Sequence, residues 1–209
     1  MLLLVRHGEA TANADGLLLG RSDVPLTARG RAQVAALRPY LGPVASVISS
    51  PLRRAIDTAE GLATGCPVQI DDRWIELDYG DLERKELGAV PAAVWQRWRT
   101  DPTYRPPAGE SLSEVAARVH EACEMLFAQP GAGAREEDGD VVVVSHVSPI
   151  KAAVGWAVGA GDDAPWRLHL STGSLTRIGW SAGRPVLHCY NWVPPLAANA
   201  TGERPAFAS

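Results

Sequence analysis

Residues 141–146 read Val-Val-Val-Val-Ser-His, and they indicate the architecture more clearly than any other segment of the chain. Four consecutive valines predict a central strand that is buried on both faces, as in a parallel sheet. Ser148-Pro149 follow shortly afterwards, and a capping serine before a proline predicts a helix to about residue 158. A buried strand that leads directly into a helix is the repeating unit of an α/β fold.

The same unit recurs on both sides of this segment. The capping residue Thr27 predicts a helix over 27–41, and the capping box from Ser111 to Glu114 predicts another that reaches about residue 127. Alternating strands and helices predict an α/β sandwich with a mainly parallel sheet, in which ligands bind beyond the carboxyl ends of the strands. The other predicted elements are loops at 8–25 and 129–140, a helix at 50–62 capped by Ser50, and strands at 2–5, 45–49, 68–70, 174–180 and 185–190.

The chain of 209 residues fits one large domain, which we place at residues 1–193. Residues 80–110 differ from the rest in composition, because they are rich in proline and hold Trp95 and Trp98. We interpret them as a part-helical insertion whose tryptophans either form core or make a substrate lid. Residues 194–209 are rich in alanine and proline and predict a flexible C-terminal tail.

Composition disfavours several classes of partner. The net charge is −4 and no basic block occurs, so we expect neither a nucleic acid nor a membrane as a partner. The apolar stretch at 1–5 is too short for a signal peptide or a membrane span. Three well-separated cysteines match neither a disulfide framework nor a zinc spacing, which favours the reducing cytoplasm. A homodimer stays an open option.

Two histidines follow predicted strands, His7 after the first strand and His146 after the valine strand. Because parallel strands end at the same edge of a sheet, we expect these side chains to lie close together. Phosphoryl transfer to a histidine needs a neutral imidazole, cationic donors around the phosphoryl oxygens, and an acid for the leaving oxygen. Arg6, Arg54 and Glu76 follow strands or begin a helix near this edge and can supply those groups.

These residues lie in motifs that resemble those of the histidine phosphatase superfamily, which includes cofactor-dependent phosphoglycerate mutases and many phosphatases. The resemblance covers about residues 2–190 and keeps the family's order. Arg-His-Gly alone is a weak signal, whereas the ordered set of motifs is specific. The matching segments are Arg6-His-Gly-Glu9 with Asn13, Asp23-Val-Pro-Leu-Thr-Ala-Arg-Gly30, Ser50-Pro-Leu-Arg-Arg-Ala-Ile-Asp-Thr-Ala59, Glu76-Leu-Asp-Tyr-Gly80, Gly109-Glu-Ser111 and Val144-Ser-His146.

The resemblance implies a three-layer α/β/α sandwich of the phosphoglycerate mutase-like type and an active site that needs neither a metal nor a cofactor. It implies that His7 is the nucleophile, which forms a phosphohistidine, and that Glu76 is the proton donor. The family's phosphate-binding arginine directly precedes an alanine, which selects Arg54 over Arg53. The implied catalytic residues are His7, Glu76, His146, Arg6 and Arg54, and the implied substrate-binding residues are Arg6, Asn13, Arg54 and His146.

Three departures from the family's pattern leave the substrate open. Val147 stands where a glycine usually follows the second histidine, Arg84 replaces another glycine, and Leu19 replaces a polar phosphate helper. Backbone contacts of the residue after His146 are therefore not carried over. Nearby alternatives to the acid Glu76 are Asp78, Asp81 and Glu83. The remaining histidines, which we interpret as structural, are His120, His169 and His188.

We expect a histidine-type acid phosphatase that hydrolyses a small phosphorylated metabolite. Segments 145–151 and 167–170 are similar to those of α-ribazole phosphatases, and the Trp- and Pro-rich insertion suggests a partly apolar substrate. A phosphoglycerate mutase is the main alternative, although the chain lacks the larger basic insertion and the Gly-Asn pair of that class. A non-catalytic phosphate-binding module is the second alternative, and the retention of every catalytic position disfavours it.

Overall fold

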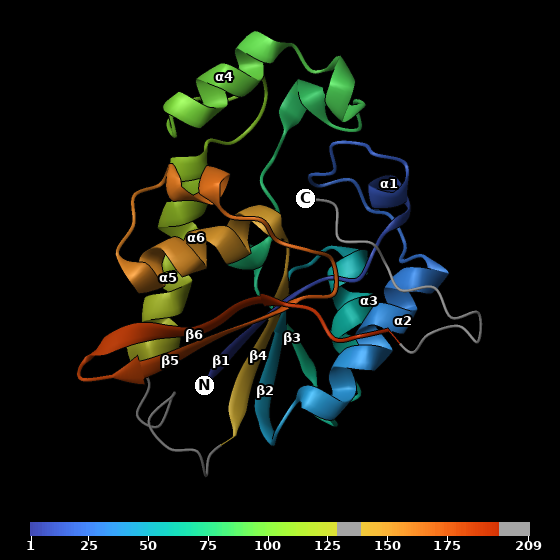
Figure 1. Cartoon of the computed structure of the whole chain (residues 1–209), viewed down its shortest axis with the longest axis vertical. Coiled ribbons are helices and arrows are strands. Elements are labelled where there is room, and N and C mark those ends of the chain that lie inside the picture. The colour runs from blue at the N-terminus through green and yellow to red at the C-terminus, as the bar shows by residue number, and fades with distance from the viewer. Residues whose placement is uncertain (129–138, 197–209) are drawn as a thin grey trace.

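A six-stranded mixed sheet forms the centre of the computed structural model, which describes residues 1–128 and 139–196 (Figure 1). Across the sheet the strands lie in the order β3-β2-β4-β1-β5-β6. All the strands predicted from the sequence are present, close to their predicted bounds. They are β1 (Leu2–Arg6), β2 (Val44–Ser49), β3 (Val68–Ile70), β4 (Asp140–Ser145), β5 (Leu175–Ser181) and β6 (Arg184–Trp192).

The valine strand β4 lies inside the sheet and pairs in parallel with β1 on one side and β2 on the other. Val142, Val143 and Val144 are fully buried, as expected for a strand that is covered on both faces. β3 adds a fourth parallel strand, whereas β5 runs antiparallel to β1 and forms a hairpin with β6. The sheet is therefore mainly parallel, as predicted.

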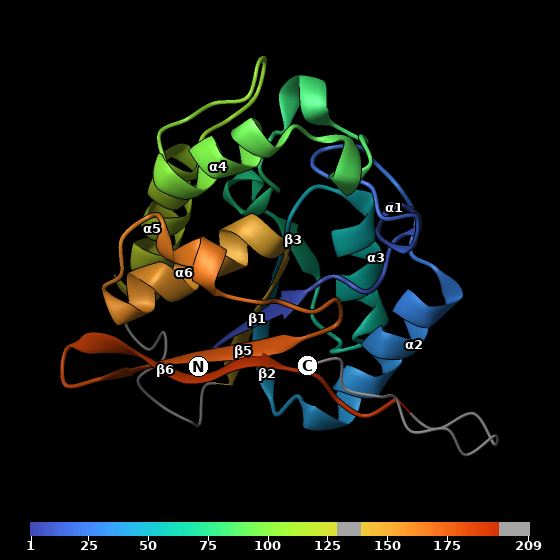
Figure 2. The same cartoon turned by 45° about the horizontal axis from the view of Figure 1, so that its top comes forward.

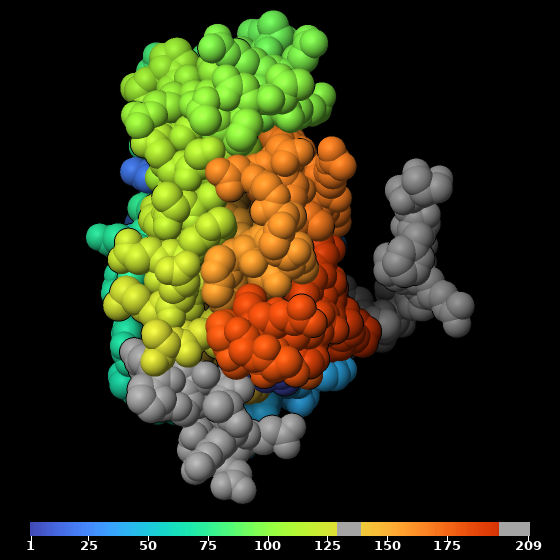
Figure 3. Space-filling view, turned by 90° about the vertical axis from the view of Figure 1, so that its left-hand side faces the viewer, coloured from blue at the N-terminus to red at the C-terminus, as the bar shows by residue number. Residues whose placement is uncertain are grey.

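Helices cover both faces of this sheet (Figure 2). Alternate residues of β1 enter different cores: Leu2 and Leu4 pack with residues of α5 and α6, whereas Leu3 and Val5 pack with residues of α2 and α3. Figure 3 shows the face on which α5 lies beside α6, with the β5–β6 hairpin below them. This arrangement is the predicted α/β/α sandwich. The helices are α1 (Thr11–Ala14), α2 (Ala28–Leu37), α3 (Arg53–Gly61), α4 (Ala92–Thr100), α5 (Leu112–Ala128) and α6 (Val147–Val158), with 3₁₀ turns at Arg38–Tyr40, Asp72–Trp74, Gly80–Leu82, Leu87–Ala89 and Ala164–Arg167.

The N-terminal helices differ in part from the prediction. Thr27 caps α2 as expected, because its hydroxyl accepts a hydrogen bond from the Gly30 amide at 3.0 Å. The helix stops at Leu37 rather than at residue 41, and a 3₁₀ turn follows, because Pro39 lacks the N–H that the next helical hydrogen bond needs. The loop predicted at 8–25 contains the short helix α1.

The two serines predicted to cap helices at 50 and 148 do not occupy the N-cap position. Leu52 is the N-cap of α3, which begins at Arg53, and His146 is the N-cap of α6. Ser148 instead lies in the first turn of α6, where its amide donates to the carboxylate of Glu76 at 3.1 Å. A side chain from a distant part of the chain therefore accepts the hydrogen bonds of the free amides at the start of α6. Local sequence signals do not reveal such a contact.

The insertion at 80–110 is part-helical, as predicted, and lies above the carboxyl ends of the strands (Figure 1). Trp98 is 1% exposed and packs against the rings of Trp95 and Trp166. The indole N–H of Trp166 donates to the Trp98 carbonyl at 2.9 Å. Of the two roles left open by the sequence, the tryptophans therefore take that of core.

The predicted tail at 194–209 and the predicted loop at 129–140 lie largely outside the described residues. The domain bounds 1–193 stay a prediction. No helix within the described ranges is both long and apolar enough to cross a membrane.

Candidate active site

The carboxyl ends of β1 and β4 hold the two histidines that follow predicted strands. Arg6 at the end of β1 pairs in register with Ser145 at the end of β4, so His7 and His146 continue neighbouring strands. Their ring centroids lie 5.0 Å apart, and the two residues are 2% and 0% exposed. The structure thus brings both histidines together at the predicted edge of the sheet.

The hydrogen bonds of His7 assign its tautomer. Nδ1 lies 2.7 Å from the carbonyl oxygen of Gly8 and must donate to it, because a carbonyl only accepts. Nε2 is then unprotonated and accepts a hydrogen bond from Nε of Arg54 at 3.3 Å. Burial, and after it the charges of Arg54 and Arg6, holds the pKa of His7 well below its ordinary value. His7 is therefore a neutral imidazole whose Nε2 lone pair faces a guanidinium.

Arg54 enters the site from the first turn of α3 and is fully buried. Its Nη1 donates to the Ser22 carbonyl at 2.8 Å and its Nη2 to the Gly20 carbonyl at 2.6 Å, which leaves Nε directed at His7. Arg53, one residue earlier, is exposed and takes part in an ion pair within α3. The structure therefore places Arg54, and not Arg53, against the histidine.

Glu76 is 3% exposed, and its side chain lies against the first residues of α6. Its carboxylate accepts hydrogen bonds from the amides of Leu77 at 2.7 Å, Val147 at 3.0 Å and Ser148 at 3.1 Å. Val147 thus supplies a backbone contact although it stands in place of the family's glycine. Burial lowers the pKa of Arg54, and the charge of Glu76 opposes that shift. The carboxylate is therefore held by backbone close to the site arginines.

Ser50 contacts His146, a contact that the sequence analysis missed. Its Oγ lies 2.7 Å from Nε2 of His146, and both residues are fully buried. If the hydroxyl donates, the ring proton stays on Nδ1. Two buried nitrogens of the site, Nδ1 of His146 and Nε of Arg6, have no hydrogen-bond partner in the described part of the chain. Burial, followed by the charge of Arg54, holds the pKa of His146 well below its ordinary value. The position of Ser50 at the end of β2 was the available signal, because His7 and His146 occupy equivalent strand ends.

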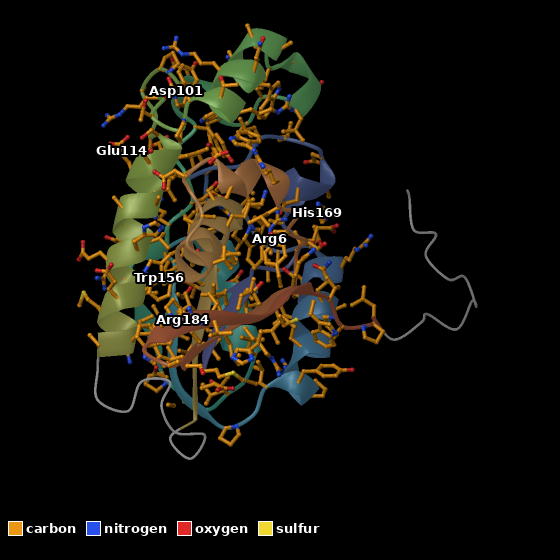
Figure 4. All side chains as sticks on the ribbon, turned by 60° about the vertical axis from the view of Figure 1, so that its left-hand side comes forward. Arg6, Asp101, Glu114, Trp156, His169 and Arg184 are labelled. Atoms are coloured by element: carbon orange, nitrogen blue, oxygen red, sulfur yellow. The ribbon has the colours of Figure 1, made fainter. Side chains whose placement is uncertain are left out.

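A cleft of about 430 Å³ opens beside Arg6. Nη1 of Arg6 donates to the Leu170 carbonyl at 2.5 Å, and burial is the main cause that lowers the pKa of Arg6 to about 10. His169, which we interpreted as structural, is exposed and lines this cleft (Figure 4). It follows no predicted strand, so the sequence carried no signal for it. Other polar lining residues are Glu9, Asn13, Arg29, Gln33, Ser171 and Thr172.

Leu19 and Arg84 are the other two departures from the family pattern. Leu19 is buried in a small apolar cluster with Ala10, Ala12 and Val24. Arg84 is exposed, and its backbone adopts a φ of 61°, a left-handed conformation that favours glycine. The side chain of Arg84 therefore faces solvent.

The comparison with protein families gives the class. Residues 2–193 match the model of the histidine phosphatase superfamily, branch 1. The chain therefore belongs to the histidine phosphatase superfamily.

The curated relatives include a bifunctional protein and probable phosphoglycerate mutases. A bifunctional protein of Mycobacterium tuberculosis is 36% identical over 183 residues, which cover 84% of this chain and 49% of the relative. The chain thus spans about half the length of that relative. A protein of Cronobacter sakazakii named probable phosphoglycerate mutase is 37% identical over 214 residues, with 96% of each chain covered.

Solved structures of phosphatases share the fold. Mycobacterial glucosyl-3-phosphoglycerate phosphatase, solved with VO3, superposes with a TM-score of 0.81 at 30% identity, over 91% of this chain and 98% of that chain. The α-ribazole phosphatase of Shigella flexneri gives a TM-score of 0.76 at 28% identity, over 91% and 95%. The superfamily assignment and the phosphatase neighbours support phosphatase activity.

Proposed function

We propose that this chain is a metal-independent phosphomonoester hydrolase, a histidine-type acid phosphatase that acts through a phosphohistidine on a small phosphorylated metabolite. The observation that carries the proposal is the neutral His7, whose Nε2 lone pair faces Arg54. Beside it, Arg6 and His146 each hold a buried nitrogen without a partner in the described residues. Such nitrogens are rare in native proteins, and phosphoryl oxygens at His7 would satisfy them.

The proposed reaction has two steps. Nε2 of His7 attacks phosphorus, the bond from phosphorus to the alcohol oxygen breaks, and that oxygen takes a proton from Glu76. Water then attacks the phosphohistidine, Glu76 takes a proton from the water, and the phosphorus–nitrogen bond breaks to release inorganic phosphate. The phosphoryl oxygens are held by Arg6, Asn13, Arg54 and His146.

Two features support the finer parts of the proposal. Burial and two arginines lower the pKa of His7, so the nucleophile stays neutral in mildly acidic solution, which suits an acid phosphatase. The polar cleft beside Arg6 favours a hydrophilic alcohol part over the partly apolar one that the insertion suggested. Cys66, Cys123 and Cys189 are free thiols, and for that reason we propose the cytoplasm as the place of action.

A phosphoglycerate mutase is the second candidate, and the Cronobacter sakazakii relative favours it because both chains match over nearly their whole length. A mutase would keep the phosphohistidine and return its phosphoryl group to a bound intermediate. The phosphatases among the structural neighbours and the short insertion support hydrolysis instead.

A metal-free assay distinguishes the hydrolase from the mutase. Phosphate release from a panel of phosphomonoesters is measured in excess EDTA, beside turnover of 3-phosphoglycerate to 2-phosphoglycerate. We expect release by the wild type, none by His7→Ala, and wild-type release by the matched control His188→Ala on the edge strand β6. Isomer turnover without net release would establish the mutase instead. Undiminished release by His7→Ala would exclude His7 as the nucleophile.

A further inference from the structure

Glu83, at the start of the insertion, binds a loop that also holds Arg54. Its Oε1 accepts the amides of Gly20 at 3.1 Å and Ser22 at 3.0 Å, and its Oε2 also accepts the Gly20 amide at 3.0 Å. The loop is 61 and 63 residues away in sequence. A single carboxylate therefore fixes two backbone positions of a loop that has no regular secondary structure of its own.

The same two loop residues are the partners of Arg54. The Gly20 and Ser22 carbonyls accept its Nη2 at 2.6 Å and its Nη1 at 2.8 Å. Both Nη atoms are thereby committed to the loop, and Nε is the nitrogen that donates to His7. The direction of the guanidinium thus depends on where these two carbonyls lie, and their position depends on Glu83.

Two further observations tie the loop to the insertion. Leu18 exchanges backbone hydrogen bonds of 2.8 Å with Arg84 and Lys85, which places the insertion alongside the loop. The fit is also close, because a Cβ on Gly20 would lie 2.4 Å from Oε2 of Glu83 and 2.8 Å from the Leu77 carbonyl. Gly20 is therefore required for the close approach of the carboxylate.

We infer that Glu83 is a positioning residue, which holds the loop at residues 20–22 so that its carbonyls direct the guanidinium of Arg54 toward His7. This inference rests on the proposed function, because it assigns Arg54 to the phosphoryl group. The first residues of the insertion thereby support the phosphate site, because they hold the loop whose carbonyls bind Arg54. The sequence did not reveal this role.

The first test compares two replacements of Glu83. Glu83→Leu removes both acceptors and should weaken both orthovanadate binding and kcat/KM for p-nitrophenyl phosphate by about 10- to 100-fold. Glu83→Gln keeps Oε1, which reaches both amides, but its NH2 group replaces the Oε2 that accepts from Gly20, so its loss should be smaller than that of Glu83→Leu. Glu86→Ala, at an exposed carboxylate three residues later, is the matched control and should change neither. Equal values for Glu83→Leu and wild type would overturn the inference.

A double-mutant cycle separates positioning from a general loss of structure. In an Arg54→Met background, Glu83→Leu should cause almost no further loss, because the group it positions is gone. The same fold-loss in both backgrounds would contradict the inference and indicate a merely structural role. If Glu83→Leu does not fold, Glu83→Asp, whose carboxylate is one methylene too short to reach both amides, should give the same pattern in smaller degree.

The readouts also separate this inference from the proposed function. Wild type that binds orthovanadate but hydrolyses no ester would overturn the hydrolase, and the cycle in orthovanadate affinity would still decide the role of Glu83. Wild type that neither binds orthovanadate nor releases phosphate would overturn both.

Discussion

His7 and His146 are buried beside two arginines, and burial is the first cause that holds the pKa of each well below its ordinary value. In the unfolded chain each histidine titrates near about 6.5. The folded protein therefore binds fewer protons than the unfolded chain between the lowered and the ordinary pKa. The stability that the neutral rings provide is complete above about pH 6.5 and is lost as the pH falls toward the lowered values.

We therefore predict that the free energy of unfolding falls on acidification from about pH 7.5 to about pH 5, steeply below the ordinary histidine pKa. Urea titrations across this range measure it. His146→Gln removes one of the two titrating rings and should flatten the slope. His188→Gln, on the exposed edge strand, is the control and should retain the wild-type slope. Identical slopes in all three proteins would contradict the prediction.

Ser50 gives a second prediction at this scale. Ser50→Ala leaves Nε2 of His146 without its partner, so the ring can change its tautomer or orientation. We expect kcat to fall by about tenfold, with a loss of stability of about 1–3 kcal/mol, because a buried polar atom is left unpaired. Ser46→Ala, at the opposite end of β2, should change neither value. An unchanged kcat for Ser50→Ala would show that this contact does not orient the ring.

How far single residues can be predicted depends on the range of their contacts. The motif at residues 50–59, in which the family's arginine precedes an alanine, selected Arg54 over Arg53, and Arg54 is the arginine that lies against the ring of His7. The contact of Ser50 with His146 spans 96 residues, and that of Arg6 with the Leu170 carbonyl spans 164. The position of Ser50 after β2 indicated the edge of the sheet that it reaches, but no local pattern gives the partner of either side chain, so both contacts appeared only in the structure.

At the scale of elements, the start of a helix can likewise depend on a residue that is distant in sequence. Thr27 and Ser111 cap their helices as predicted, because each hydroxyl accepts an amide three residues later in the chain. The prediction that Ser148 caps α6 was wrong, because the carboxylate of Glu76 accepts the hydrogen bonds of the amides at the start of that helix. A cap supplied from another element overrides the local signal, and in this fold that element carries the candidate acid.

The turn between Glu83 and the segment that pairs with Leu18 carries a strain that can be measured. Arg84 holds a φ of 61° there, which costs a non-glycine residue about 1–2 kcal/mol. Arg84→Gly removes this strain but loses more entropy on folding, so we expect a net gain of up to about 1 kcal/mol in urea unfolding. Arg84→Ala keeps the strain and should gain nothing. If the free energy of unfolding of Arg84→Gly were no higher than that of Arg84→Ala, the backbone at residue 84 would not be strained.

The whole molecule is a sheet with a different core on each face, and the sequence predicts those cores better than it predicts strand order. A run of buried residues such as Val142, Val143 and Val144 indicates that both faces are covered. It does not say which strands are the neighbours, because pairing uses backbone atoms that every residue shares. The order β3-β2-β4-β1-β5-β6 therefore came from the structure alone.

The insertion gives the last prediction, since its aromatic core belongs to the core that α5 and α6 share with the sheet. Trp98 is 1% exposed within that cluster and contacts Trp166, which lies outside the insertion. We expect Trp98→Ala to lower the free energy of unfolding by about 3–5 kcal/mol, and the whole chain to unfold in one transition. Circular dichroism and phosphate release should be lost at the same urea concentration. Trp180→Ala, at a residue that is 39% exposed, is the control and should cost much less. If activity disappeared in a separate, earlier transition, the insertion would be a unit of its own and the single domain would be wrong.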